Sequence, residues 1–267
     1  MSYSVPNLSI EFILLNLFCS VAFPVAMLVY LRRRKRADWL PFPVGCAVFL
    51  LFAMALEGVC NNLLFLRTPF GETLLNTPIL YALTGGLMAG LFEETGRYIA
   101  FSTVLRPRLD KDENALMYGA GHGGIEMLAV LGVASVNNLV YAIAINSGEA
   151  VSLLETVPAE TRDQLEAVFF QLAETPSWQF LLGLLERVFA LVLHLSCSVV
   201  VWFAAKKPGK RRLYPVAIGM HLAVDAIAAY LSRTGVPLPV TEAAVCLLSV
   251  AAALYARRVW NICRTEQ

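Results

Sequence analysis

The sequence is poor in charged residues. Only 15% of its 267 residues are charged and 58% are hydrophobic, whereas a soluble domain carries about 25% charged residues. This shortage excludes a disordered chain, a nucleic-acid binder built on basic patches and most soluble enzymes. The net charge of +1 predicts no partner. Because the apolar residues fall in long blocks and the mean hydropathy is +0.64, the chain is typical of a membrane protein embedded in the lipid bilayer.

Signatures of several other classes are missing. The six cysteines contain no C-x-x-C pair, so neither a zinc knuckle nor a disulfide scaffold is indicated. There is no H-E-x-x-H zinc-protease motif and no G-x-S-x-G nucleophile elbow. The apolar runs also lack the lysine that a retinal-type Schiff base requires. We see no internal repeat or second domain and expect a single membrane-embedded domain over residues 1–267.

Seven apolar runs are long enough to cross a bilayer. They predict an all-α, polytopic, multi-pass protein of the cell membrane. The first run is expected to be an uncleaved helix, since it is long enough to span and no Lys or Arg precedes it. The fourth is overlong, and we expect it to bend or leave the hydrocarbon near Asn137-Asn138. The runs cover residues 8–31, 40–66, 78–105, 114–146, 178–205, 213–231 and 239–256.

Basic residues in the connections predict the orientation. Alternate connections and the end of the chain carry sixteen Lys and Arg residues, whereas the other side carries only three. The positive-inside rule therefore places the N-terminus outside and the C-terminus in the cytoplasm. The basic side holds Arg32 to Arg36, Arg106, Arg108, Lys111, Lys206, Lys207, Lys210, Arg211, Arg212, Arg257, Arg258 and Arg264.

The one sizeable loop, about residues 147–177, is expected to lie outside. It carries six acidic residues, and Leu165, Val168, Phe169 and Leu172 follow helical spacing. This pattern predicts a short amphipathic helix on the outer surface. We favour a structural lid over a substrate gate.

Ten ionisable residues within the apolar runs stand out. A charged residue at mid-membrane costs about 2.5–3.5 kcal/mol on insertion scales, so such residues are rare unless they pair or act. Ion pairing would explain Glu93 with Arg97, one helical turn apart, and would suit Arg187. The ten are Glu93, Glu94, Arg97, His122, Glu126, Glu186, Arg187, His194, His221 and Asp225.

Ion pairing does not explain the three histidines, none of which lies in a predicted loop. His122, His194 and His221 lie 11, 12 and 9 residues from the basic residue that ends each helix, and Glu94 lies 12 residues from its own. At about 1.5 Å per residue, these four groups fall within one layer, about 13–18 Å deep. We therefore expect one shared site.

Spacing along the helices groups these residues further. His122 with Glu126, and His221 with Asp225, are i,i+4 pairs, so each pair shares a helix face. Glycines on both sides of His122 allow backbone, water or substrate to approach it closely. The Gly86-x-x-x-Gly90 motif, just before the acidic pair, predicts close packing of another helix.

The residues in this layer suit acid–base chemistry. Adjacent Glu93 and Glu94 point about 100° apart on a helix, so we expect one to act as a general base and the other to fix Arg97 or a histidine. Three histidines and a carboxylate also suit zinc. Protonated carboxylates or a charged histidine would balance the negative charge equally well, so the residues leave the metal question open.

At these residues the chain resembles the YhfC family of intramembrane metalloproteases. The matching elements are Glu93-Glu94-x-x-Arg97, the G-H-G-G-I-E run from Gly121 to Glu126, Glu186-Arg187 followed by His194, and His221-x-x-x-Asp225. That family is distantly similar to the type II CAAX prenyl protease and bacteriocin-processing superfamily and to PrsW. The E-E-x-x-R spacing here is nearer to the E-E-x-x-K of PrsW than to the E-E-x-x-x-R of the prenyl proteases.

The resemblance implies an intramembrane peptidase that hydrolyses a membrane protein or peptide with an activated water. It implies that Glu93 or Glu94 is the base, that His122 orients the water, and that His194 and His221, with Asp225 behind, bind a metal or stabilise the oxyanion. A zinc ion would be held by His122, His194 and His221. In the CAAX relatives the glutamate mechanism is thought to need no catalytic metal. Supporting roles would fall to Arg97, Glu126, Glu186 and Arg187.

Three other functions fit parts of the pattern. A proton- or cation-coupled transporter could use the same buried acids and histidines, but it would be favoured by inverted repeats, which we do not find. A bis-histidine haem protein would leave the acidic pair unexplained. An immunity or scaffold protein with an inactive fold would need none of this chemistry.

Overall fold

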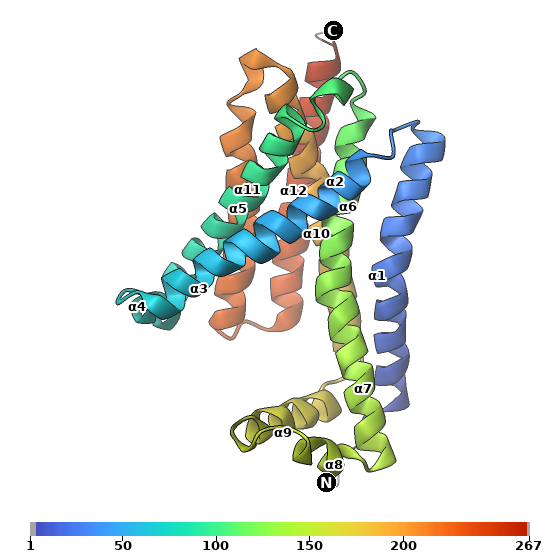
Figure 1. Cartoon of the computed structure of the whole chain (residues 1–267), viewed down its shortest axis with the longest axis vertical. Coiled ribbons are helices and arrows are strands. Elements are labelled where there is room, and N and C mark those ends of the chain that lie inside the picture. Colours follow the sequence, from blue (N-terminus) through green and yellow to red (C-terminus); the bar gives the residue numbers. More distant parts are fainter. Residues whose placement is uncertain (1–3, 266–267) are drawn as a thin grey trace. The chain divides into compact units, whose positions relative to one another are not determined.

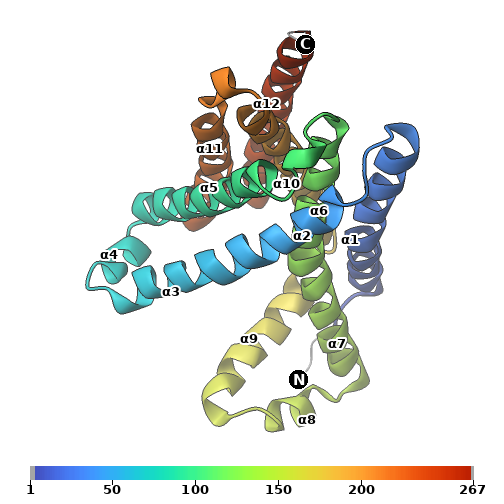
Figure 2. The same cartoon turned by 45° about the horizontal axis from the view of Figure 1, so that its top comes forward.

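The computed structural model describes residues 4–265, and every element within that range is a helix. The all-α prediction is therefore confirmed. Figures 1 and 2 show the helices from two directions. The elements are α1 (Asn7–Arg34), α2 (Pro41–Val48), η1 (Phe49–Glu57), α3 (Gly58–Arg67), α4 (Gly71–Asn76), α5 (Pro78–Ser102), η2 (Arg106–Arg108), α6 (Glu113–Met127), η3 (Leu128–Gly132), α7 (Val133–Ser147), α8 (Ala150–Glu155), α9 (Ala159–Glu174), α10 (Trp178–Lys206), η4 (Pro208–Lys210), α11 (Leu213–Arg233) and α12 (Leu238–Thr265).

Six helical stretches in the described residues are long and apolar enough to cross a membrane, and the chain is a multi-pass membrane protein. The remaining predicted span corresponds to α5, a helix of 25 residues. Its hydropathy is lowered by Glu93, Glu94 and Arg97, so it is not among the six. The count of seven spans and the orientation stay predictions. The six are Asn7–Arg34, Pro41–Arg67, Glu113–Ser147, Trp178–Lys206, Pro208–Arg233 and Leu238–Thr265.

The helices form two compact units. The first unit joins residues 4–23 with Met127–Arg187, and the second joins Pro24–Glu126 with residues 188–265. Of the ten ionisable residues singled out from the sequence, only Glu186 and Arg187 belong to the first unit. The single domain expected over residues 1–267 stays a prediction.

The first unit is held together by an apolar core and by hydrogen bonds from side chains to backbone. Asn146 on α7 accepts a hydrogen bond from the Val5 backbone N–H at 2.8 Å and donates one to the Val5 carbonyl at 2.9 Å. Asn16 on α1 donates to the Phe180 carbonyl at 2.9 Å. The buried core residues are Val5, Ile13, Ala142, Ile145, Ala150, Phe169 and Leu172.

The segment expected to form one amphipathic helix holds two helices, α8 and α9. On α9, Phe169 and Leu172 are buried in the core of the first unit, and Leu165 packs against that core. Val168, which was expected to share this apolar face, is 41% exposed. The position of this segment outside the membrane stays a prediction.

The overlong fourth run is one helical stretch whose hydrogen-bond pattern changes at a π-helix. This π-helix, η3, lies between α6 and α7 and covers Leu128–Gly132. Asn137-Asn138 lie within α7. The change in hydrogen-bond pattern therefore comes before Asn137-Asn138 in the chain, and both asparagines lie in regular α-helix.

In the second unit, α5 lies side by side with α11 (Figures 1 and 2). A Cβ added at Gly86 would come within 2.9 Å of the Leu222 carbonyl oxygen, and one at Gly90 within 2.8 Å of the Ile218 carbonyl oxygen. A larger residue would not fit at either position without a shift of backbone. The close packing predicted from the two glycines is confirmed, and α11 is the packing partner.

Connections predicted to be cytoplasmic contact one another at one end of the second unit (Figure 1). Asp38, between α1 and α2, accepts hydrogen bonds from Lys111 at 2.8 Å and from Asn114 at 3.0 Å. The hydrogen bond from Lys111 holds the pKa of the Asp38 carboxyl below its usual value. These contacts place the α1–α2 and α5–α6 connections together, as the predicted alternation requires.

Asp112 is the buried centre of this end, with 2% exposure. Its carboxylate accepts hydrogen bonds from Trp202 Nε1 at 3.1 Å, Lys206 Nζ at 2.8 Å and Arg264 Nε at 3.3 Å. Trp202 and Lys206 lie on α10 and Arg264 lies on α12. One carboxylate just before α6 therefore joins the ends of three long helices.

An Asp112→Ala variant is expected to lower the free energy of unfolding by about 1–3 kcal/mol. The reason is that the buried indole N–H of Trp202 loses its acceptor and Lys206 loses its counter-charge. Thermal unfolding in detergent measures the effect, with the exposed Asp110→Ala as the matched control. Equal unfolding midpoints for the two variants would contradict the prediction.

Candidate active site

Four helices of the second unit bring the predicted site residues together. Glu93, Glu94 and Arg97 lie within little more than one turn of α5. His122 and Glu126 lie on α6, His194 on α10, and His221 and Asp225 on α11. The cluster is joined by the hydrogen bonds and ion pairs described below, so the structure unites eight of the ten predicted residues.

Glu93 is the centre of the cluster. His122 Nε2 donates a hydrogen bond to Glu93 Oε2 at 2.8 Å. His194 Nδ1 lies 3.7 Å from the same oxygen, and His221 Nε2 lies 3.8 Å from Glu93 Oε1. Glu93 is 6% exposed and the three histidines are 0–2% exposed. The layer predicted from helix depth therefore corresponds to three imidazoles around one carboxylate.

Glu94 points to different partners. It forms a buried ion pair with Arg97 and accepts a hydrogen bond from His221 Nδ1 at 2.8 Å. As expected, the two adjacent glutamates point to different partners, but Arg97 pairs with Glu94 and not with Glu93. The general-base role of one of them stays a prediction. Glu93 faces the three histidines, while Glu94 holds Arg97 and fixes the far nitrogen of one histidine ring.

The contact with Arg97 shows which ring nitrogen of His194 acts as a hydrogen-bond acceptor. Its Nη2 lies 3.2 Å from His194 Nδ1, and a guanidinium can only donate hydrogen bonds. His194 Nδ1 is therefore the acceptor and carries no proton. The other ring nitrogen, Nε2, contacts the Glu126 carboxylate. Glu126 and Arg97 thus orient the ring of His194 from its two sides.

Asp225 completes the cluster at its more exposed edge. Its Oδ2 lies 3.3 Å from His221 Nε2, and its side chain is 38% exposed. The side chains of Glu93, Glu94 and Glu126 are at most 14% exposed. Asp225 therefore lies at the most accessible side of the carboxylate cluster.

Aromatic side chains enclose His122. The Phe49 ring meets it edge-on with a centroid distance of 5.4 Å, and the Tyr118 ring stacks on it at 5.8 Å. The Arg97 guanidinium lies 5.9 Å from the centre of the same Tyr118 ring. We did not single out these aromatic residues from the sequence. Tyr118 precedes His122 by four residues, and this i,i+4 spacing is the signal that could have identified it.

Glu57 on η1 was also missed. It is half-buried, accepts a hydrogen bond from Asn61 at 3.1 Å and interacts electrostatically with Glu93 and His221. An isolated carboxylate in the second apolar run is as costly as the ten that were singled out. The same argument would therefore have found it.

The cluster fits a divalent metal ion in donor type, spacing and charge. Donor atoms of Glu93, His194 and His221 all lie within 4.8 Å of one another, and so do those of Glu94, Cys197 and His221. Carboxylate, imidazole and thiolate are zinc ligands. The cluster contains four carboxylates and one guanidinium, that of Arg97, so a dication would reduce the excess negative charge.

The predicted metal set differs from this geometry at His122. His122 belongs to neither group of donors. Its Nδ1 is buried and has no hydrogen-bond partner among the described residues, and Glu94 Oε2 is in the same situation. Because buried polar atoms are normally paired, these two atoms are places where a water or a substrate group would bind.

Glu186 and Arg187 form an ion pair with each other in the first unit. They are adjacent in the chain and were expected to support the site or to lock helices together. Their pairing with each other is the contact that the structure gives. Their role in supporting the candidate site stays a prediction.

Backbone contact explains two glycines near His122. A Cβ added at Gly45 on α2 would lie 2.8 Å from the backbone nitrogen of His122, and one at Gly121 would lie 2.9 Å from Phe42 Cα. Helices α2 and α6 therefore meet backbone to backbone beside the candidate site. The glycines beside His122 were expected to allow backbone, water or substrate to approach it. In the structure, the backbone of α2 makes this approach.

A Gly45→Ala variant is expected to destabilise the protein by about 1–3 kcal/mol, because backbone atoms of α6 cannot move aside as a flexible side chain can. Gly58→Ala, on α3, is the matched control, since a Cβ there meets nothing within 4 Å. Thermal unfolding in detergent should show a lower midpoint for Gly45→Ala and an unchanged or higher one for Gly58→Ala. A midpoint for Gly45→Ala that equals that of wild type would contradict the prediction.

Comparison with known proteins adds independent evidence. The sequence model of the YhfC intramembrane metalloprotease family matches residues 19–247. A relative from Bacillus subtilis (strain 168), described as "Uncharacterized membrane protein YhfC", is 31% identical over 256 residues, which cover 93% of this chain and 97% of that protein. No solved structure matches the chain. The matched region includes every residue of the cluster, and the chain belongs to the YhfC intramembrane metalloprotease family.

Proposed function

We propose that the protein is an intramembrane peptidase that hydrolyses a peptide bond of a membrane-associated protein or peptide, with Glu93 as the general base. The observation that carries this proposal is the position of Glu93, within 2.8–3.8 Å of a nitrogen atom of each of three buried histidines. Among the described residues, Glu94, Glu126 and Asp225 each contact only one of the three rings. The family supports membrane protease activity as the class of function.

Glu93 and His122 act on the water as a pair. Glu93 accepts a proton from the water, whose oxygen attacks the carbonyl carbon of the substrate. The hydrogen bond from His122 Nε2 orients the Glu93 carboxylate during this step. Glu93 then returns the proton to the leaving nitrogen as the C–N bond breaks. The products are a carboxylic acid and an amine, and Glu93 is again a carboxylate, so atoms and charge balance.

The remaining residues position these groups. Glu94 holds Arg97 and His221, while Glu126 and Arg97 hold His194 in one tautomer. The imidazoles of His194 and His221 face the oxygen atoms of Glu93, and that of His221 stabilises the negative charge that develops on the substrate oxygen. Asp225 lies behind His221 and orients that ring through the contact of its Oδ2 with Nε2 at 3.3 Å.

A divalent metal would be held by His194, His221 and one oxygen of Glu93, which leaves the second Glu93 oxygen against His122. When bound, such an ion supplies Lewis-acid polarisation of the substrate carbonyl and acidifies water.

Isotope incorporation tests the proposal. The purified protein is reconstituted in liposomes with transmembrane peptides labelled at both ends, in water enriched in ¹⁸O. We expect cleaved peptides whose new carboxyl terminus carries one ¹⁸O atom, as measured by mass spectrometry, and none in liposomes without the protein. Intact peptides together with protein-dependent proton or cation flux would overturn the proposal and favour a transporter.

A further inference from the structure

A polar pocket lies at the end of the second unit where the basic connections meet. It has a volume of about 360 Å³ and is formed by the end of α5, the α5–α6 connection, the end of α10 and the α10–α11 connection. None of the eight residues of the catalytic cluster lines it. The lining residues that carry charge or a hydroxyl group are Tyr98, Ser102, Arg106, Lys206 and Arg211.

The charge of this pocket is of one sign. Arg106, Lys206 and Arg211 each contribute a cation, and no residue that lines the pocket is a carboxylate. Asp112 accepts a hydrogen bond from Lys206 Nζ at 2.8 Å from outside the lining. An ammonium has three donors, so this bond fixes Lys206 and leaves donors for another group. Neither arginine forms an ion pair with another described residue.

The hydroxyl groups add hydrogen-bonding capacity beside the cations. Tyr98 and Ser102 are both half-buried on the last turns of α5, four residues apart, so they share a helix face. The Tyr98 ring packs against the Tyr214 ring with a centroid distance of 5.0 Å, which limits its movement. Three cations with two hydroxyl groups match a phosphate group, which has several strong acceptor oxygens and a negative charge.

We propose that this pocket binds the phosphate of an anionic phospholipid headgroup. The pocket lies at the ends of membrane-spanning helices, which is the level of lipid headgroups, and anionic leaflets are attracted to clusters of Lys and Arg. It joins the ends of α5 and α10, the helices that carry Glu93 and His194. A bound headgroup would therefore hold together the ends of two helices that contribute to the catalytic cluster.

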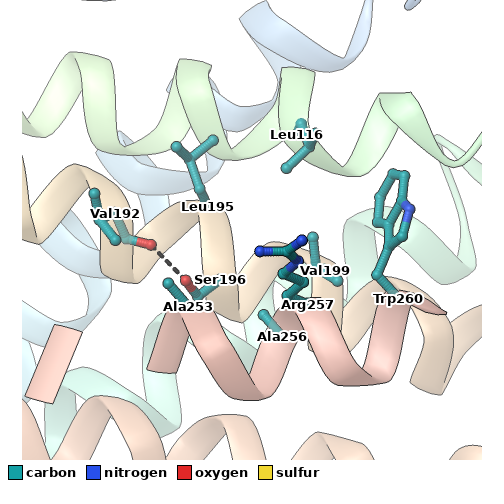
Figure 3. A pocket seen from close by; sticks show the side chains of 9 residues that line it. All are labelled: Leu116, Val192, Leu195, Ser196, Val199, Ala253, Ala256, Arg257 and Trp260. Carbon is teal, nitrogen blue, oxygen red and sulfur yellow. Dashed lines mark hydrogen bonds between the residues drawn. The ribbon is translucent and has the colours of Figure 1, made fainter. Parts of the chain in front are cut away.

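A second pocket of the same unit provides a control. It has a volume of about 260 Å³ and lies between α6, α10 and α12. Figure 3 shows that its walls are apolar side chains apart from Ser196 and Arg257. The Ser196 hydroxyl is already engaged, since it donates to the Val192 carbonyl. Arg257 is thus an exposed arginine of the same unit without a second cation in its pocket.

Lipid titration followed by native mass spectrometry tests the proposal. Purified protein in detergent is titrated with phosphatidylglycerol, phosphatidylcholine or inorganic phosphate. We expect phosphatidylglycerol to bind more tightly than the other two probes. The Arg106→Gln, Arg211→Gln double variant should weaken its binding by at least about tenfold, because each cation near an anionic headgroup contributes measurably. Arg257→Gln should leave that binding unchanged.

Three outcomes would overturn the proposal. Equal affinity for phosphatidylglycerol and phosphatidylcholine would exclude recognition of the anionic headgroup. Equal affinity for inorganic phosphate would assign the pocket to free phosphate. Equal loss in Arg257→Gln would indicate unspecific attraction to surface charge. Both substituted arginines are exposed, so unchanged thermal unfolding midpoints will show that any loss of binding is not a loss of folding.

Discussion

A Glu93→Gln variant will lose peptide hydrolysis by about 10²- to 10⁴-fold, the usual contribution of a general acid–base group. Glutamine keeps the size and the hydrogen-bonding oxygen of the side chain but cannot accept the proton of the attacking water. The rate of ¹⁸O incorporation into cleaved transmembrane peptides is the measurement. Because Glu93 is surrounded by three histidine rings, no neighbouring carboxylate of the cluster is positioned to replace it.

Glu11→Gln is the matched control for this experiment. Glu11 is also a carboxylate on a membrane-spanning helix, but it is exposed and lies in the first unit. Its variant should retain the wild-type rate. A Glu93→Gln protein that folds normally and keeps more than about a tenth of the wild-type rate would contradict the assignment of Glu93 as the base.

The second large effect concerns the metal. We expect the purified protein to contain about one divalent metal ion per chain and the His194→Ala, His221→Ala double variant to contain none, as measured by elemental mass spectrometry. Two imidazoles and a carboxylate supply three ligands, and a site that loses two of three protein ligands cannot hold zinc tightly. Chelation of the metal from the wild-type protein should abolish hydrolysis. Addition of zinc should then restore it.

His122→Ala separates metal binding from catalysis. His122 lies outside both groups of donors, so this variant should keep the metal while it loses activity. Metal loss in His122→Ala would contradict the assigned ligand set. An absence of metal from the wild-type protein, together with hydrolysis that resists chelation, would overturn the metal prediction and leave Glu93 to act without a Lewis acid.

The shared layer of the site was predictable because depth in a membrane helix follows directly from residue number. Counting from the basic helix ends placed Glu94 and the three histidines together, and these residues do lie in one cluster. The separate orientations of Glu93 and Glu94 followed in the same way from the 100° turn between neighbours on a helix. The glycine spacing on α5 likewise predicted close packing.

Which partner each side chain has was not predictable. Distances from the helix ends carry no information on rotation about the helix axis, so the ring that faces Glu93 Oε2 could not be assigned before the packing was known. The role of Arg97 against His194, 97 residues away, also depends on how α5 meets α10. The π-helix at Leu128–Gly132 has no sequence signal comparable to the Asn137-Asn138 pair.

The hydrogen bonds that join three helix ends at Asp112 have a consequence for the order of biosynthesis. Chains are made from the N-terminus, and two of the three donors to Asp112 lie on α10 while the third, Arg264, lies on α12. A nascent chain therefore carries a carboxylate without its counter-charge until Lys206 on α10 has been made, and Arg264 can join only after α12 has followed. A chain that stops before α10 would leave Asp112 with none of these three donors.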